Sequence, residues 1–140
     1  MDERIKHISR KAALRRADTA FSIFIRTRDS QEYQCKAFKC ISCGRVLPIQ
    51  QCDCGHYVNR SHNSLRYSEK NCNAQCRHCN RFDEGNQQGY RRGLIEKYGE
   101  RDVLLLEAAK YRRHSLSTSV LLDIEELYKL KIRQFKYRIK

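Results

Sequence analysis

The sequence of 140 residues lacks long apolar runs, repeats and low-complexity tracts, and it contains a single proline, Pro48. No stretch approaches the roughly 20 consecutive apolar residues that a helix needs to cross a bilayer, so we expect no membrane span. The N-terminal segment MDERIKHISRKAALRRAD has no apolar core of the kind found in secretory signals, which predicts a cytoplasmic protein. Hydrophobic residues still make up 40% of the chain, enough to exclude a disordered chain and to favour one small domain.

Acidic residues are scarce, since 16 Asp and Glu face 29 Lys and Arg and leave a net charge of +13. Such an excess makes a polyanion the leading partner class, and nucleic acid the leading polyanion. The alternative is a basic surface that only keeps the chain in solution.

Helical periodicity occurs at both ends of the chain and not in its middle. Residues 8–28 carry an apolar stripe and a basic face, and residues 90–99, 100–113 and 121–139 also have helical patterns. The last of these stripes comprises Ile124, Leu127, Tyr128, Ile132, Phe135 and Ile139. Gly99 and the STS segment at 117–119 are typical of a helix end and a helix start.

Residues 40–84 instead hold most of the cysteines and two short β-type runs, RVLPIQ and HYV. This texture predicts an α+β protein with three parts. We expect a basic helix over 1–36, a small core over 37–86, and helices over 87–140 that pack on the core or form a dimer interface.

Two pairs of cysteines, CISC at 40–43 and CRHC at 76–79, share the C-x-x-C spacing. Each such turn can aim two thiolates at one ion, and two turns complete the tetrahedron of a structural zinc site. We therefore predict a Zn²⁺ site made by Cys40, Cys43, Cys76 and Cys79, with redox dithiols or buried thiols as the alternative. Cys35, Cys52, Cys54 and Cys72 lack this spacing, which favours core packing over a second zinc site.

The chain between and beside these pairs carries His56 after DCG, Asn71, and Asn80 directly behind the last cysteine. This order resembles the HNH nucleases with a ββα-metal fold, with asparagine in the last position. The chain more closely resembles the phage NinG family of recombination endonucleases, also called Rap. The resemblance spans about residues 18–135 and is carried by FSIFIRTRD (21–29), CISCGRVLP (40–48), DCGHYVNRSH (53–62), QCRHCNRFDEGN (75–86) and YRRGLIEKYGE (90–100).

The resemblance implies a zinc-stapled ββα-metal core, flanked by N- and C-terminal helices, that hydrolyses phosphodiesters in branched DNA such as Holliday junctions or D-loops. It places such a protein in the cytoplasm of a bacterial host, as a phage or prophage product. His56 would be the general base, because a histidine pKa lies near working pH. Asn71 would fix the loop that orients the imidazole, and Asn80 would offer an oxygen to Mg²⁺ or Mn²⁺. Arg60 would hold the phosphate, with help from Arg66 or Arg81.

One position departs from the HNH pattern, because many of these nucleases place an aspartate ligand directly before the base and this chain has Gly55. Asp53 is the nearest carboxylate, and the resemblance makes it a candidate second metal ligand. A site with Asn80 as its only protein ligand, completed by water and phosphate, is the competing arrangement. His62 is a further candidate at the metal.

The main alternative to a nuclease is a zinc-stabilised DNA- or RNA-binding protein without catalytic activity, which needs only the cysteines and the positive charge. Within the nuclease hypothesis, no separate base-reading module is evident, so recognition of backbone and shape is expected. The near two-fold symmetry of a junction would suit a homodimer, for which the stripe at 124–139 is one candidate interface.

Overall fold

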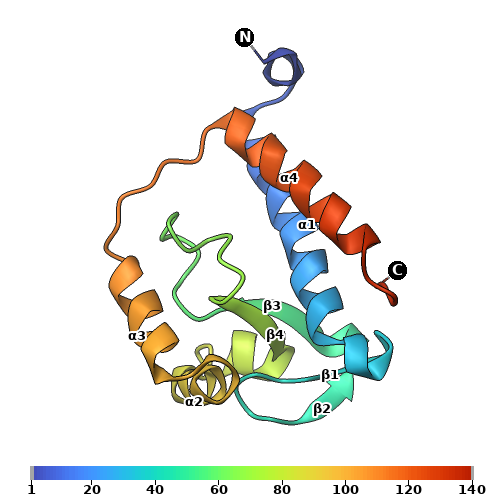
Figure 1. Ribbon diagram of the computed structural model, residues 1–140, viewed down its shortest axis with the longest axis vertical. Helices are drawn as coiled ribbons and strands as arrows, with labels where there is room; N and C mark the ends of the chain where they lie inside the picture. Colours follow the sequence, from blue (N-terminus) through green and yellow to red (C-terminus); the bar gives the residue numbers. More distant parts are fainter. Residues whose placement is uncertain (1, 140) are drawn as a thin grey trace.

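The computed structural model describes residues 2–139 and contains two short antiparallel hairpins surrounded by helices (Figure 1). Strand β1 (Ala37–Lys39) pairs with β2 (Val46–Pro48), and β3 (Cys52–His56) pairs with β4 (Cys72–Cys76). A two-stranded sheet is marginal by itself and needs a packed layer for stability. Helices supply that layer, so the predicted mixed α+β class is confirmed.

The long helix α1 (Arg10–Asp29) lies against the β3–β4 hairpin on one side and α4 (Thr118–Arg133) on the other (Figure 1). Ser9 and Ser117 begin these helices, and each side-chain oxygen accepts a hydrogen bond from a backbone N–H three residues on. The start predicted at 117–119 is thus confirmed. The core here gathers buried aromatic and aliphatic side chains: Ala20, Phe21, Phe24, Ile25, Cys72 and Tyr128.

The C-terminal stripe differs in part from the prediction, because α4 ends at Arg133 and Leu127 is 46% exposed on its outer side. Ile124, Tyr128 and Phe135 pack against α1 within the same chain. Most of that stripe is therefore covered within the chain, whereas Val120, Leu127 and Leu130 of α4 are 41%, 46% and 50% exposed, and the homodimer stays a prediction.

The short strands are shifted from the predicted runs. Within RVLPIQ only Val46–Pro48 is extended, because Ile49–Gln51 forms a 3-10 turn, η3. Within HYV only His56 belongs to a strand, and it is the last residue of β3. Cysteine-rich residues 52–55 form the rest of that strand, although cysteine and aspartate give little β signal.

Helix α2 (Gln87–Tyr98) lies on the other side of the β3–β4 hairpin, where the Tyr90 hydroxyl is 2.6 Å from the Gly55 carbonyl, and α3 (Glu100–Ala109) packs against α2 (Figure 1). Gly99 ends α2 as predicted, with φ of 92°. The α2 backbone lies directly on the first cysteine turn, because a Cβ on Gly93 would come 2.0 Å from the Ile41 carbonyl oxygen and one on Gly89 2.3 Å from that of Ser42. Only glycine allows this approach. A π-helical turn, η4 (His78–Phe82), precedes α2.

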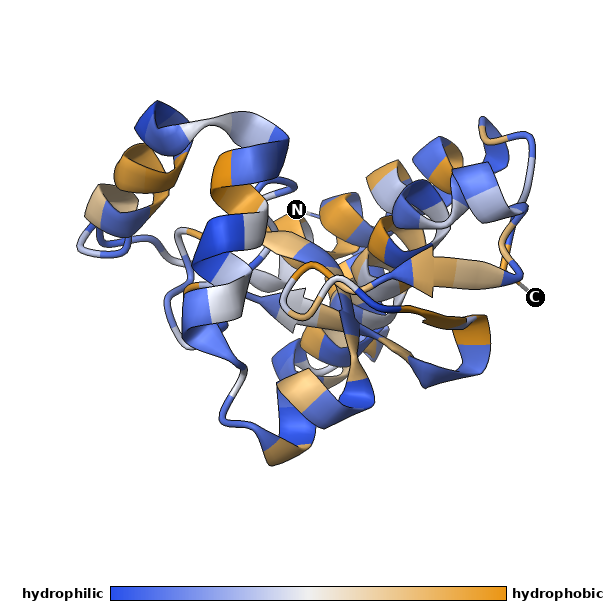
Figure 2. Cartoon of the chain, turned by 90° about the horizontal axis from the view of Figure 1, so that it is seen from below, coloured by the Kyte–Doolittle hydropathy of each residue, from blue (hydrophilic) through white to orange (hydrophobic). Residues whose placement is uncertain are grey.

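Hydrophilic residues occur on every helix and loop, and the apolar stretches are short (Figure 2). No helix among residues 2–139 is both long and apolar enough to cross a membrane. The 3-10 turns η1 (Glu3–His7) and η2 (Gln31–Tyr33) flank α1.

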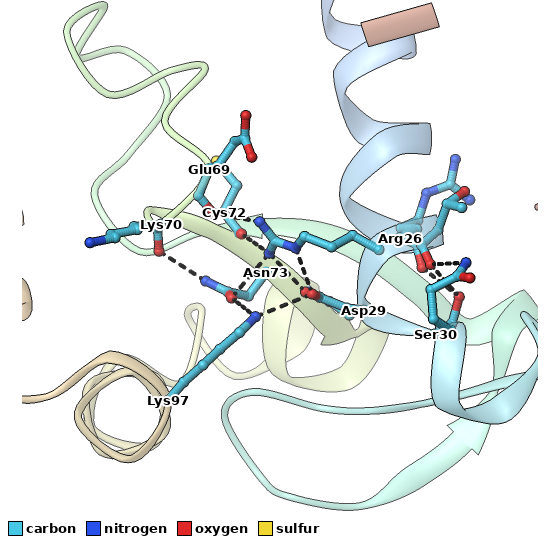
Figure 3. A network of polar contacts seen from close by, with 12 residues as sticks. Arg26, Asp29, Ser30, Glu69, Lys70, Cys72, Asn73 and Lys97 are labelled. Carbon is cyan, nitrogen blue, oxygen red and sulfur yellow. Dashed lines mark hydrogen bonds and ion pairs between the residues drawn. The ribbon is translucent and has the colours of Figure 1, made fainter. Parts of the chain in front are cut away.

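A partly buried ion network joins the end of α1 to β4 and α2 (Figure 3). Asp29 accepts hydrogen bonds from Arg28 Nε at 2.7 Å, Lys97 Nζ at 3.1 Å and the Ala74 backbone N–H at 2.8 Å. Lys97 also donates to the side-chain oxygen of Asn73 at 2.6 Å. Burial opposes ionisation of Asp29, but these cations outweigh it and hold the pKa of Asp29 below its usual value.

Replacing Asp29 by Asn should lower the free energy of unfolding by about 2 kcal/mol at pH 7, because Arg28, whose side chain is 19% exposed, and the more exposed Lys97 lose their counter-charge. The pKa of Asp29 is depressed in the folded chain, so its contribution exists above the unfolded pKa near 4 and is lost as pH falls through the lower folded value. The gap between the two proteins should therefore close below about pH 4.

Urea unfolding of both proteins across this pH range measures the effect. Asp102→Asn is the matched control, because Asp102 pairs with Lys70, whose side chain is 54% exposed, and should cost less than about 1 kcal/mol. Equal losses in the two variants would contradict a special role for the Asp29 network.

Candidate active site and metal centre

The four cysteines of the two C-x-x-C turns converge on one point. Their sulfur atoms all lie within 4.8 Å of one another, and Cys43 Sγ is 3.9 Å from Cys76 Sγ. A tetrahedral zinc with bonds of about 2.3 Å requires sulfur separations of about 3.8 Å. The thiols therefore fit such an ion, and the cluster that the spacing predicts could hold a metal such as zinc.

Backbone and side-chain donors surround the sulfurs, as thiolates require. The N–H groups of Cys76 and Cys79 donate to Cys40 Sγ and Cys76 Sγ at 3.3 and 3.4 Å. Asn86 donates to Cys79 Sγ at 3.4 Å while its oxygen caps α2 by accepting from Gly89 N–H. The centre thus connects the β1–β2 hairpin, β4, η4 and the start of α2.

His56 lies at the end of β3, directly opposite Cys72 in the register of the hairpin. Its Nε2 is 3.0 Å from the Arg66 carbonyl oxygen, which can only accept, so Nε2 carries the proton and Nδ1 keeps a lone pair. Burial lowers the pKa of His56; the Arg66 carbonyl partly opposes this shift, and the charges of Arg66 and Arg60 reinforce it. The imidazole is consequently neutral at neutral pH and able to take a proton.

His56 and Asn80 line the same cleft, which has a volume of about 590 Å³ and is closed on one side by α1. Asn80 reaches it from η4, one residue after Cys79 of the four-cysteine cluster. Asn80 Nδ2 donates to Asp53 at 3.0 Å, and its Oδ1 accepts no hydrogen bond from another described residue. An amide oxygen is therefore available in the cleft that His56 also lines.

Asp53 is not free to bind a cation as it stands. Arg81 binds both of its carboxylate oxygens, at 2.8 and 2.9 Å, and Asn80 binds one of them. Strand alternation also directs Asp53 to the face opposite His56. Asp53 is therefore occupied by partners within the chain, and so is Arg81, the predicted DNA contact.

The other predicted arginines separate into two kinds. Arg60 is exposed and lines the cleft, where its guanidinium contacts no other described side chain through a hydrogen bond or ion pair. The Arg66 side chain is 12% exposed, and its guanidinium pairs with Asp18 of α1 at 2.6 Å. Arg66 therefore holds the loop in place, and its carbonyl holds His56, whereas Arg60 remains available for a phosphate.

Asn71 closes the loop that follows His56. Its oxygen accepts from Val58 N–H at 2.8 Å, and its nitrogen donates to the carbonyls of Val58 and Leu65 at 3.0 and 3.3 Å. The side chain is fully buried. His62, in contrast, is exposed and lies beside the Lys110 carbonyl at 3.2 Å, outside the cleft lining.

Tyr90 is a positioning residue that sequence reasoning missed. It is fully buried in α2, and its hydroxyl lies 2.6 Å from the Gly55 carbonyl and 3.2 Å from the Asn71 carbonyl, between the strand ends that hold His56. The sequence carried no signal for this role, because the hydroxyl's partners on the strand ends are backbone carbonyls. Gly55 stands where many HNH nucleases have an aspartate ligand. It lies against Gln75, because a Cβ at position 55 would come 2.0 Å from Gln75 Oε1.

The four remaining cysteines do not share one role. Cys35 and Cys52 are buried and belong to neither ligand group, and Cys52 packs in the core against Cys40, Cys76 and Cys79, as core packing predicts. Cys54 and Cys72 instead bring their sulfurs within 4.8 Å of each other and of a ring nitrogen of His56. The sequence offered no spacing signal for this group, because its members meet only through the strand register.

Comparison with known proteins gives a consistent result. The family model described as Bacteriophage Lambda NinG protein matches residues 2–138. “Protein ninG” of Salmonella phage P22 is 34% identical over 124 residues, covering 88% of this chain and 57% of that protein. The protein of the same name in Escherichia phage lambda is 32% identical with the same coverage. The chain thus spans little more than half the length of these relatives, and no solved structure matches it.

Replacing Cys43 by Ser should remove one tightly held zinc per chain and unfold the lobe around the cysteine turns, because structural zinc contributes about 10 kcal/mol or more to such sites. Zinc content after dialysis and circular dichroism measure the change. Cys35→Ser is the matched control, since Cys35 is buried outside both clusters. Unaltered zinc content in Cys43→Ser would rule out the four-cysteine site.

Proposed function

Because the chain belongs to the NinG family of bacteriophage proteins, we propose that it is a metal-dependent endonuclease of the HNH type that acts on branched DNA. The observation that carries this proposal is the shared cleft of His56 and Asn80, with His56 Nε2 held by a backbone carbonyl. The order of hairpin, helical turn and zinc cluster agrees with a ββα-metal core.

His56 acts as the general base. Its Nδ1 takes a proton from a water molecule while that water attacks the scissile phosphorus and the bond to the leaving oxygen breaks. The Arg66 carbonyl keeps the reactive tautomer and accepts more strongly as the ring becomes positive. Asn71 accepts a hydrogen bond from Val58 N–H, two residues after His56, and the Tyr90 hydroxyl contacts the Gly55 carbonyl directly before it. The backbone on both sides of the ring is thereby held.

Asn80 would hold the catalytic cation through its free amide oxygen. Mg²⁺ suits such a site because it prefers oxygen ligands and retains several waters, and Mn²⁺ accepts the same ligands. When bound, the cation would stabilise charge on the phosphate and the leaving oxygen. Asp53 would contribute a second oxygen only if Arg81 exchanged it for a DNA phosphate.

The charges around the cleft suit a nucleic acid backbone. Arg26 and Arg60 line it, whereas Asp18, the acidic residue of its lining, is already paired with Arg66. This balance attracts phosphate without reading bases. The preference for branched DNA rests on the family resemblance, and a paired cut across a junction would call for two copies of the chain.

Replacing His56 by Ala should reduce Mg²⁺-dependent nicking of a four-way junction by about 10²- to 10⁴-fold, because the base is lost. DNA binding and the zinc of the four-cysteine centre should persist, since the ring takes no part in that centre. Single-turnover cleavage, compared on a four-way junction, a flap, a D-loop and a linear duplex with Mg²⁺ and with EDTA, measures the effect.

His62→Ala is the matched control, because this exposed histidine lies in the same loop but outside the cleft lining. It should cleave at the rate of the unmodified chain. Undiminished cleavage by His56→Ala would end the assignment of the base. No cleavage of any substrate by the unmodified chain would leave the alternative function, a basic zinc-stabilised binder.

Replacing Arg60 by Ala should weaken binding to every DNA sequence alike and reduce the slope of log affinity against log salt by about 1, as expected when one phosphate contact is lost. Fluorescence anisotropy at several salt concentrations provides the measurement. Arg81→Ala serves for comparison, because Asp53 occupies its guanidinium in the free chain. A larger loss for Arg81 than for Arg60 would reverse the proposed roles.

A further inference from the structure

We propose that Cys54, His56 and Cys72 form a second metal site, selective for a thiophilic divalent cation such as Zn²⁺, and that an ion there switches the proposed nuclease off. The binding part stands by itself, whereas the switching part rests on the proposed function. The residues lie apart from the four cysteines of the structural centre.

The hairpin register brings the three ligands together. His56 faces Cys72 directly across the β3–β4 ladder, and Cys54 lies two residues before His56 on the same face. Their ligand atoms all lie within 4.8 Å of one another. Two paired strands fix this spacing more rigidly than a loop would, so the site needs little rearrangement to close on an ion.

The cluster is also reachable. Cys72 forms its floor and is fully buried, but Cys54 and His56 are partly exposed and line the cleft. Three protein ligands leave one tetrahedral position open toward the cleft, where water can complete the site. A purely structural role in core packing would not require two of the three groups to face solvent.

His56 already makes the second contact that metal-bound histidines usually make. Its Nε2–H donates to the Arg66 carbonyl at 3.0 Å, which leaves the Nδ1 lone pair as the atom for a metal. Arg66 is itself anchored by Asp18, so the ring orientation is supported from α1. The donor set of two thiols and one imidazole suits Zn²⁺ and excludes Mg²⁺, which prefers oxygen.

The same lone pair cannot serve both purposes. An ion bound to Nδ1 prevents the imidazole from accepting a proton from water, so the base is lost while the fold is kept. The two cation types are thereby sorted by chemistry within one cleft: a hard ion at the Asn80 oxygen supports cleavage, and a soft ion at the Cys54–His56–Cys72 cluster stops it.

Metal binding by the full chain and its Cys54→Ala variant tests the site directly. Cys54 is partly exposed, so this variant should fold, and Cys54→Ser provides a second variant of closer size. With buffered Zn²⁺ or Co²⁺ in excess, the unmodified chain should bind one more equivalent than either variant. The affinity lost should exceed the about 10- to 100-fold that an outer partner of a metal ligand contributes.

Absorption of the cobalt form supplies a readout that core packing would not alter, because thiolate-to-cobalt bands should grow in two steps in the unmodified chain and in one step in the variants. Cys35→Ala is the matched control and should keep both steps. Equal stoichiometry and equal spectra for the unmodified chain and the Cys54 variants would overturn the site.

Cleavage in fixed Mg²⁺ with increasing Zn²⁺ tests the switch, with each protein compared to its own rate without zinc. We expect strong inhibition of the unmodified chain and of Cys35→Ala, reversal by a chelator, and resistance of Cys54→Ala. Equal inhibition of all proteins would overturn the switch. Whether the second metal site exists would then be decided by the metal-binding measurements alone. If the unmodified chain cleaves no DNA, the proposed nuclease function is wrong. The number of metal ions bound per chain would still show whether the second site exists.

Discussion

The convergence of Cys40, Cys43, Cys76 and Cys79 is the constraint on which the rest of the structure depends. Neither hairpin has enough apolar surface to be stable by itself, and the two C-x-x-C turns tie them to one another. Asn86 extends this link to α2 by contacting a sulfur and capping the helix at once. Asn80 follows a ligand directly, so the cluster also sets the position of the cleft.

Partly buried ion pairs place a second constraint on the fold. The Asp29 network joins α1, β4 and α2 behind the hairpin, and the Asp18–Arg66 pair joins α1 to the loop on the cleft side. Such pairs add little net stability compared with apolar packing, but they require one specific geometry. In this chain they fix the strand end that carries His56 from two directions.

The sequence predicted what depends on local pattern. The 8–28 helix, the end at Gly99, the start at 117–119 and the meeting of the four cysteines all follow from periodicity, capping or spacing, and the structure agrees with each. The strand carrying His56 was placed too late, because Cys52–Gly55 has weak β propensity and pairs only through its partner. Leu127 was assigned to the packed stripe since its spacing fits, yet the helix turns it outward.

Long-range contacts were beyond local pattern. The Cys54–His56–Cys72 cluster depends on register, the Tyr90 contacts are to backbone carbonyls, and the engagement of Arg66 by Asp18 spans 48 residues. Arg60, Arg66 and Arg81 look alike in sequence, and only their partners in the fold distinguish them. Candidate residues could therefore be named from the sequence. Which of them are free of partners within the chain could be read only from the structure.

The contact between Gln75 and Gly55 restricts how this strand can vary among related proteins. Gln75 donates to Ser42 Oγ and the Gly85 carbonyl, and its side chain fills the space that any Cβ at position 55 would need. An aspartate at position 55 would displace the Gln75 side chain and its two hydrogen bonds to the cysteine-turn region. Because the Gln75 Cβ itself would lie 2.8 Å from the new Cβ, the two strands would also have to move apart, so the backbone of the hairpin, and not one flexible neighbour, keeps a side chain out of the position before His56.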